Sequence, residues 1–408
     1  MIGQSFRLSD FVECGMNDWM GCRKSGIDQL AYIETRTLAP SAKSVPFVRV
    51  RRLSKPAQNA PFFESAPFTP AAMGVKALFP QLAAARRRGN LLECIRGMCV
   101  GVDAYVWLHI FACRHAAAVV KGNDFSALIG DFLQRAEWLL RCGATPTFVF
   151  DGARLPAKDL TATARAERRA KAFAAAEAGS ECEPCNPDYR AAVKIDFGMV
   201  QQVIAALRTR GFHYVVAPYE ADAQLVHLMR TGCIGAVISV DSDLVVLGAA
   251  TVYFRVNYFT GDATVMHQKN IGGNASDDDD DDDDADAVSL RGFVHQHGLP
   301  ALHAYALLAG CDYDCHCRGI GQKKALDIIR DAGVNVADIV RHVDEVHELG
   351  LTPGQDWGRR MHEALDCFLH PIVYDLQTGT QRALSNEDVS GKPHLGVVCD
   401  PLQARPGP

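Results

Sequence analysis

The stretch that decides the fold is Tyr219–Asp243. It begins with Tyr-Glu-Ala-Asp at residues 219–222, where a helix is expected to start. It ends with the apolar run Ile234–Val240 followed by Asp-Ser-Asp at 241–243. The stretch therefore holds two pairs of carboxylates at i, i+2 spacing: Glu220, Asp222, Asp241 and Asp243. Residues two apart at the end of a strand can point the same way, because successive side chains alternate between faces.

So many like charges at one point would repel one another strongly. A bound divalent cation relieves that repulsion, and Mg²⁺ prefers oxygen ligands. The pattern therefore predicts a metal site. A solvated loop of acids is the alternative for either pair taken alone, and it explains both pairs together less well.

Apolar runs of strand length alternate with helical patterns along much of the chain. The expected strands are Met98–Val102, Thr147–Phe150, Tyr214–Val216, Ala236–Val240 and Thr251–Val256. The expected helices are Asp124–Cys142, Lys194–Arg210 and Glu220–Thr231. This alternation predicts an α/β fold with a mainly parallel central sheet and helices on both faces.

Three of the expected strands are followed directly by an aspartate. These residues are Asp103, Asp151 and Asp241. Ligands of parallel α/β sheets bind outside the carboxyl ends of the strands. A single aspartate at such a position is more often a helix cap, but its recurrence after three strands favours one shared site.

The composition is that of a globular protein with one unusual segment. The chain has 408 residues, enough for two or three domains, and 48% of them are hydrophobic. Its net charge of −6 includes the uninterrupted run Asp277–Asp284, so the remainder is close to neutral. This balance permits a local basic surface for nucleic acid but does not require one. The 14 Cys and the lack of a secretory signal favour a reducing compartment, and no apolar run approaches the ~20 residues of a membrane span.

Two stretches are expected to be disordered. Residues 1–72 become rich in Pro and Ser toward their end and show no sustained periodicity, which favours a disordered N-terminal extension. A mitochondrial presequence is the weaker alternative for them, because such presequences are poor in acids. The low-complexity acidic insert 274–286 cannot bury any of its side chains.

Two basic stretches can face phosphates. After Pro156, steps of seven and four place Lys158, Arg165 and Arg169 on one face of an expected helix. That helix can bind phosphates, or it can be an ordinary solvated surface helix. Further along, two glycines at 319 and 321 precede a helix that begins with Lys-Lys, and they let backbone amides approach a phosphate closely.

Seven motifs together resemble one family, the structure-specific 5′ nucleases, which include flap endonuclease and exonuclease 1. The resemblance covers Met73 to about Asp375, with the motifs in family order. Its carrying segments are Met73-Gly-Val-Lys-Ala-Leu, Val102-Asp-Ala-Tyr-Val-Trp-Leu-His109, Phe148-Val-Phe-Asp-Gly152, Leu155-Pro-Ala-Lys158, Ala217-Pro-Tyr-Glu-Ala-Asp-Ala-Gln224, Val240-Asp-Ser-Asp-Leu244 and Gly310-Cys-Asp-Tyr313 with Arg318-Gly-Ile-Gly321. Their forms look closer to the exonuclease 1 nuclease domain than to flap endonuclease.

The resemblance implies a PIN-like 5′ nuclease fold and a two-metal phosphodiesterase. It implies a nuclease core at 73–290 with a helical arch at 156–190, a helix–two-turn–helix region at 291–376, and a tail at 377–408. Two Mg²⁺, or Mn²⁺ in their place, would be held by seven acids: Asp103, Asp151, Glu220, Asp222, Asp241, Asp243 and Asp312. Lys158 and Arg165 would contact the scissile phosphate. Contacts to DNA would come from Tyr105, His109, Arg168, Arg169, Gly319, Gly321, Lys323 and Lys324.

The chain departs from the family at several positions. Arch arginines are replaced by Thr163 and Ala166, and Val240 stands where an acid is common. Ala309 stands where the family has a serine that helps to bind K⁺, which leaves that ion open. No sliding-clamp motif is found before Pro408, and no mismatch-repair partner site can be carried over.

The expected function is a Mg²⁺-dependent 5′→3′ exonuclease on double-stranded DNA with 5′-flap endonuclease activity, in repair or recombination. Its substrates would be 5′ ends, nicks, gaps and flaps in the nucleus, or in the mitochondrion if residues 1–72 are a targeting segment. A replicative flap endonuclease and a non-catalytic DNA-junction binder are the alternatives. The complete set of seven acids argues against the binder, which would not need them.

Overall fold

The computed structural model describes residues 74–178, 187–272, 289–313, 315, 319–346 and 357–385. The expected N-terminal extension and the acidic insert 274–286 lie outside these ranges. None of the helices in the described ranges combines the length and apolar composition that a bilayer crossing requires.

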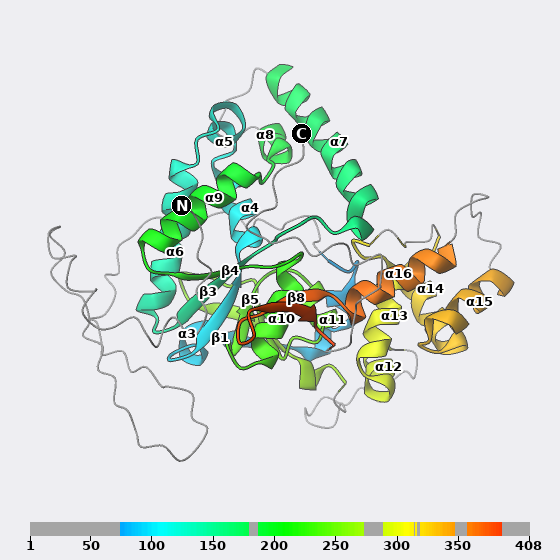
Figure 1. Ribbon diagram of the computed structural model, residues 1–408. Coiled ribbons are helices and arrows are strands. Elements are labelled where there is room, and N and C mark those ends of the chain that lie inside the picture. The colour runs from blue at the N-terminus through cyan, green and yellow to red at the C-terminus, as the bar shows by residue number, and fades with distance from the viewer. Residues whose placement is uncertain are drawn as a thin grey trace, which may run out of the picture.

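A seven-stranded sheet forms the centre of the protein (Figure 1). Its strand order is β1-β7-β6-β5-β2-β3-β4, and β6, β5, β2, β3 and β4 run parallel to one another. Strand β7 is antiparallel to both β6 and β1. The bounds are β1 Arg86–Asn90, β2 Cys99–Asp103, β3 Thr145–Phe150, β4 His213–Val216, β5 Ala236–Ile238, β6 Thr251–Phe254 and β7 Asp262–His267. The predicted α/β fold with a mainly parallel sheet is confirmed.

All five expected strands are present, and two strands of this sheet were not predicted. The expected strand at 236–240 ends two residues early, because the chain turns toward the acids after Ile238. Strand β1 was missed because its sequence, Arg-Arg-Arg-Gly-Asn, has no alternation of apolar side chains. It is an edge strand, and its positive charges discourage pairing with another chain. Strand β7 completes the sheet between β1 and β6.

Side chains alternate between the two faces of the sheet, and each face has its own core. On β3, Phe148 and Phe150 belong to one core and Val149 to the other. The first core is formed with α4 Ala104–Arg114, α6 Ser126–Arg141 and α9 Phe197–Thr209. Trp107 of α4 packs edge-on against the Phe148 ring, with centroids 5.5 Å apart. Figure 1 shows α4 and α9 above the sheet, α6 at its left and α10 (Ala221–Arg230) below it.

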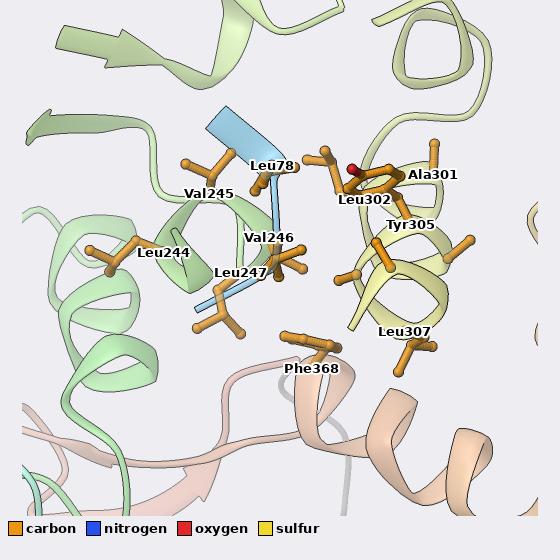
Figure 2. Packing of buried hydrophobic residues seen from close by; sticks show 14 of the residues in the cluster. Leu78, Leu244, Val245, Val246, Leu247, Ala301, Leu302, Tyr305, Leu307 and Phe368 are labelled. Carbon is orange, nitrogen blue, oxygen red and sulfur yellow. The ribbon is translucent and has the colours of Figure 1, made fainter. Parts of the chain in front are cut away.

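The second core continues into the C-terminal helices (Figure 2). It joins α2 Leu78–Gln81, α11 Asp243–Val246, α13 Leu299–Ala309 and α16 Trp357–Leu369. Residues 301–309 of α13 are all buried, as expected for a helix that is apolar on every side. Leu78, Tyr305 and Phe368 all lie in this cluster and are at most 3% exposed. The described residues between 291 and 376 therefore share a core with residues that precede them in the chain.

The remaining helices surround this frame. Helix α7 stands away from the sheet at the upper right of Figure 1 and packs on α8. Ala176 of α7 and Tyr189 of α8 are buried, and Lys121 lies over the Tyr189 ring at 4.9 Å. The bounds are α3 Leu91–Cys94, α5 Ala116–Gly122, α7 Asp159–Ala178, α8 Pro187–Ala192, α12 Leu290–His297, α14 Gln322–Ala332 and α15 Val336–Val346, with short 3₁₀ turns at Ala83–Ala85, Pro156–Lys158 and Gln268–Asn270.

One side chain ties α10 to a small C-terminal hairpin. The hairpin consists of β8 Ile372–Asp375 and β9 Thr380–Ala383, which pair antiparallel. Gln224 of α10 donates from Nε2 to the Tyr374 carbonyl at 2.8 Å and accepts from the Tyr374 amide at 2.7 Å. Gln224 is fully buried. Its amide therefore makes with β8 the pair of hydrogen bonds that a neighbouring strand would make.

Candidate active site

The three strands that end in predicted site acids are neighbours in the sheet. Strands β5, β2 and β3 are adjacent and parallel, so their carboxyl ends lie at the same edge. Asp103 is the last residue of β2, Asp151 directly follows β3, and Asp241 lies three residues beyond β5. The recurrence of aspartate after predicted strands therefore located one common edge of the sheet.

Asp103 both caps a helix and faces the other acids. Its Oδ1 accepts from the amides of Tyr105 at 3.0 Å and Val106 at 3.2 Å, which caps α4. Its Oδ2 accepts from Ser239 Oγ at 2.8 Å, and the same hydroxyl oxygen accepts from the Asp241 amide at 3.1 Å. Ser239 thus links the acid of β2 to the loop after β5. Ser239 was not among the predicted site residues, although a single serine within the apolar run Ile234–Val240 was a usable signal.

A close approach of two backbone segments brings Asp151 to the start of α10. The amides of Gly152 and Ala153 donate to the carbonyls of Tyr219 and Pro218 at 2.7 and 2.9 Å. Asp151 in turn accepts from the Ala221 amide at 2.8 Å. A Cβ on Gly152 would lie 1.9 Å from the Ala217 carbonyl oxygen, so only glycine fits there.

The three acids Asp222, Asp241 and Asp243 form the centre of the cluster. Each offers a carboxylate oxygen, and these oxygens lie within 4.8 Å of one another. The Asp243 amide donates to Asp241 Oδ1 at 2.9 Å, which fixes the turn between them. The Oδ1 atoms of Asp222 and Asp243 are buried and have no hydrogen-bond partner among the described residues. Buried carboxylate oxygens without donors are costly, so these atoms fit a bound cation.

The start of the described chain passes beside the same acids. Gly74 has φ +82°, and a Cβ there would lie 2.3 Å from Asp241 Oδ1 and 2.7 Å from Asp243 Oδ1. The Val75 amide donates to Ser242 Oγ at 2.9 Å, and the Lys76 amide donates to the Gly310 carbonyl at 2.8 Å. Residues 74–76 are therefore held between the loops that carry the acids.

Burial and mutual repulsion raise the pKa of five of these carboxyl groups. Burial raises the pKa of Asp151 to about 7, and the Asp103 charge adds to the effect. Burial likewise raises the pKa of Asp241 to about 7. Burial and neighbouring carboxylates raise the pKa of Asp222 and Asp243 well above the ordinary value, and burial raises that of Asp103. A bound cation would offset this mutual repulsion and favour the ionised form of these groups.

The two basic side chains that are predicted to be catalytic each form an ion pair with one of the predicted metal ligands. Lys158 forms an ion pair with Glu220, and Arg165 donates from Nη2 to both oxygens of Asp312 at 2.8 Å. Burial disfavours the charge on Lys158, but the Glu220 carboxylate and other acids raise its pKa well above the ordinary range. Lys158 and Arg165 therefore each lie beside one of the seven predicted acids, and their contact with a scissile phosphate stays a prediction.

The acid set fits Mg²⁺ better than a softer metal. The donors that converge are carboxylate oxygens, which suit Mg²⁺ or Mn²⁺, whereas zinc and copper sites use His and Cys. Asp222, Asp241 and Asp243 can hold one cation. Asp103, Asp151, Glu220 and Asp312 interact electrostatically with these three residues or with one another.

The predicted DNA-contacting residues lie in three places. Tyr105 and His109 are on α4, and burial together with Arg165 and Arg169 lowers the His109 pKa to about 4, so that histidine is neutral at physiological pH. Arg168 and Arg169 are on α7. Gly319 and Gly321 precede α14, where an open groove of about 650 Å³ is lined by Gln81, Gly321, Gln322, Lys323, Lys324 and Leu326.

Comparison with known families gives two matches in order along the chain. The XPG N-terminal domain matches residues 73–172, and the XPG I-region matches residues 211–312. The two matched regions hold all seven predicted acids.

Curated relatives include exonuclease 1 proteins. Exodeoxyribonuclease 1 of Schizosaccharomyces pombe is 34% identical over 260 residues, which are 62% of this chain and 42% of that protein. Exonuclease 1 of Xenopus laevis is 28% identical over 310 residues, 74% of this chain and 39% of that protein. The chain thus spans less than half the length of these relatives. The DNA damage-inducible protein DIN7 of Saccharomyces cerevisiae is 28% identical over 281 residues, 68% of this chain and 61% of that protein.

Among solved structures, the catalytic core of Rad2 in complex with DNA substrate shares the fold. It has a TM-score of 0.51 at 20% identity, over 77% of this chain and 92% of that chain. With both XPG regions in order and carboxylates gathered at the strand ends of this sheet, the chain belongs to the structure-specific 5′ nuclease family.

Proposed function

We propose that this protein is a 5′→3′ exonuclease on double-stranded DNA with 5′-flap endonuclease activity, acting in DNA repair with two bound Mg²⁺. The observation that supports the proposal is the acid cluster near the carboxyl ends of β2, β3 and β5. Asp222, Asp241 and Asp243 bring carboxylate oxygens within 4.8 Å of one another, and the other four predicted acids interact electrostatically with them or with each other. Lys158 and Arg165 pair with two of those four acids. Relatives named exonuclease 1 support the reaction, and the Rad2 core bound to DNA substrate supports the ligand.

The acids would hold the metals: Asp103, Asp151, Glu220, Asp222, Asp241, Asp243 and Asp312. Bound Mg²⁺ supplies Lewis acidity at the scissile phosphate and makes a bound water a better nucleophile. The protein must supply the carboxylates in ionised form. Burial raises the pKa of Asp151 and Asp241 to about 7 in the metal-free protein, so protons compete with Mg²⁺ for these groups, and the Mg²⁺ concentration for half-maximal cleavage should fall as the pH rises through the neutral range.

Lys158 and Arg165 would stabilise the charge that develops on the phosphate. Both already lie at the acid cluster, so a phosphodiester placed there would meet them without a large movement of the chain. Positive charge aimed at the transition state acts on the rate of the chemical step more than on binding.

The uncut duplex would bind away from the acids. The groove before α14 carries Lys323 and Lys324 beside two glycines, which suits contact with the phosphates of a backbone. Burial and the charges of Arg165 and Arg169 lower the pKa of His109 to about 4, so it can meet a base pair at the duplex end as a neutral ring. We expect a protein with such a role in DNA repair to act in the nucleus. A fluorescent fusion would reveal a mitochondrial location instead.

The test is digestion of end-labelled duplex, nicked and flapped DNA with and without Mg²⁺. Metal-dependent release of nucleotides from 5′ ends is expected, with cleavage at flap junctions. Asp151→Ala and Asp241→Ala should abolish cleavage and largely retain DNA binding, whereas Asp344→Asn, an exposed acid on α15, should leave both unchanged. Cleavage of flaps alone would favour a flap endonuclease, and binding without any cleavage would favour a junction-binding protein. Near-normal turnover in either alanine variant would refute the metal assignment.

A further inference from the structure

Tyr313 contacts both Glu220, a predicted metal ligand, and Lys158, a predicted catalytic residue. Its hydroxyl donates to Glu220 Oε2 at 3.1 Å, while Lys158 pairs with the other oxygen of the same carboxylate. The Lys158 ammonium also lies over the Tyr313 ring, 5.0 Å from its centroid. Tyr313, Glu220 and Lys158 therefore contact one another pairwise, although they come from three distant parts of the chain.

The ring of Tyr313 is itself held in place. It is 3% exposed and packs edge-on against Phe368 of α16, with centroids 4.8 Å apart and planes at 79°. A neutral tyrosine hydroxyl satisfies a carboxylate by donating to it, which leaves the other carboxylate oxygen to face a cation. Glu220 immediately precedes α10, and its side chain makes no capping hydrogen bond to that helix. Tyr313 thus restricts a carboxylate that the helix itself does not orient.

We infer that Tyr313 is a positioning residue of the nuclease centre, which orients Glu220 through its hydroxyl and Lys158 through its ring. The inference rests on the proposed function for its catalytic consequence. Removing a side chain that hydrogen-bonds to a metal ligand typically lowers metal affinity or activity by roughly 10–100-fold. Cation–π contact with a buried ring restricts where an ammonium can lie.

The first variant is Tyr313→Phe, which keeps the ring, its packing on Phe368 and its contact with Lys158. It removes only the donor to Glu220. We expect about 10-fold weaker Mn²⁺ binding to DNA-free protein in a calorimetric titration, and a similar rise in the Mg²⁺ concentration for half-maximal cleavage. The affinity for DNA measured without metal should be unchanged. The second variant, Tyr313→Leu, also removes the ring, so its single-turnover rate at saturating Mg²⁺ should fall below that of Tyr313→Phe.

A matched control lies eight residues away. Tyr305 is fully buried in α13, and its hydroxyl has no hydrogen-bond partner within the described part of the chain (Figure 2). Tyr305→Phe therefore removes the same atom from a buried tyrosine away from the acids, and it should leave Mn²⁺ affinity and cleavage unchanged. Equal weakening by Tyr305→Phe and Tyr313→Phe would mean a general packing effect and would overturn the inference.

A double-mutant cycle tests whether the hydroxyl acts through Glu220. In a Glu220→Ala background, Tyr313→Phe should cause no further loss of Mn²⁺ affinity, because its acceptor is already absent. If the losses of Mn²⁺ affinity from Glu220→Ala and Tyr313→Phe simply add, the hydroxyl does not act through Glu220 and the inference is refuted. A Tyr313→Phe protein that binds Mn²⁺ like the wild type would refute it as well. If the wild type binds Mn²⁺ as expected but cleaves no DNA, the proposed function fails while the positioning role stands.

Discussion

Replacing Asp241 by asparagine should stabilise the metal-free protein at alkaline pH while abolishing cleavage. Asp241 is 7% exposed, and burial raises its pKa from the ordinary 3.8 to about 7. Each pKa unit corresponds to about 1.4 kcal/mol, so ionising this carboxyl in the folded protein costs about 4 kcal/mol. Asparagine removes that charge and keeps the oxygen that accepts from the Asp243 amide.

The sign of the effect depends on pH. A carboxyl whose pKa is raised by folding favours the folded state only at low pH, and that stability is lost as the pH rises from about 4 through 7. The gain from asparagine should therefore grow from about 1 kcal/mol near pH 4.5 to about 4 kcal/mol near pH 8. The assay is urea unfolding in the presence of a chelator at both pH values. Excess Mg²⁺ should stabilise the wild type and have little effect on the variant.

Asp375 provides a control of opposite sign. It is 5% exposed, and although burial alone would raise its pKa, hydrogen bonds from the Gln377 and Thr378 amides lower it. Asp375→Asn should therefore destabilise the protein near pH 8. If Asp241→Asn were less stable than the wild type near pH 8, or if its gain did not change with pH, the reasoning about the acid cluster would be refuted.

Three further outcomes are expected. Lys158→Ala and Arg165→Ala should each lower the single-turnover rate by roughly 10²–10³-fold and weaken DNA binding much less, whereas a loss confined to affinity would reduce both to ordinary phosphate contacts. Gly152→Ala should cost several kcal/mol in urea unfolding and lower activity, because its Cβ would lie 1.9 Å from the Ala217 carbonyl oxygen; a variant of wild-type stability would contradict this close approach. A protein that starts at Met73 should retain or exceed the specific activity of the full chain at two salt concentrations, and a folded but inactive product would assign residues 1–72 to the nuclease.

The position of the candidate site could be predicted from the sequence because several of its acids lie at or just after the ends of strands. Apolar runs that end in Asp103, Asp151 and the 241–243 turn predicted both the strands and the edge where they meet. What it could not supply were contacts between distant loops. The pairing of Arg165 with Asp312, for example, depends on where α7 lies relative to the chain that follows α13. Matching motifs to the family placed both residues in the site without indicating that they touch.

Other omissions have equally simple physical causes. Strand β1 lacks an apolar pattern because it lies at the sheet edge, where neighbours rather than its own side chains decide the conformation. Ser239 lies within an apolar run, and Tyr313 lies in a family motif for which no role was predicted. Each contributes to the site through one hydrogen bond to an acid that is distant in sequence. Propensity and spacing carry no information about such partners.

The amide of Gln224 bears on where a minimal fragment of this nuclease can end. The matched family regions stop at residue 312, and a fragment cut there would leave both hydrogen-bonding groups of that buried amide without Tyr374. The affected helix, α10, begins directly after Glu220 and carries Asp222, so the damage would reach the acids themselves. Any shortened version for crystallisation or engineering should therefore extend through the β8–β9 hairpin to Ser385.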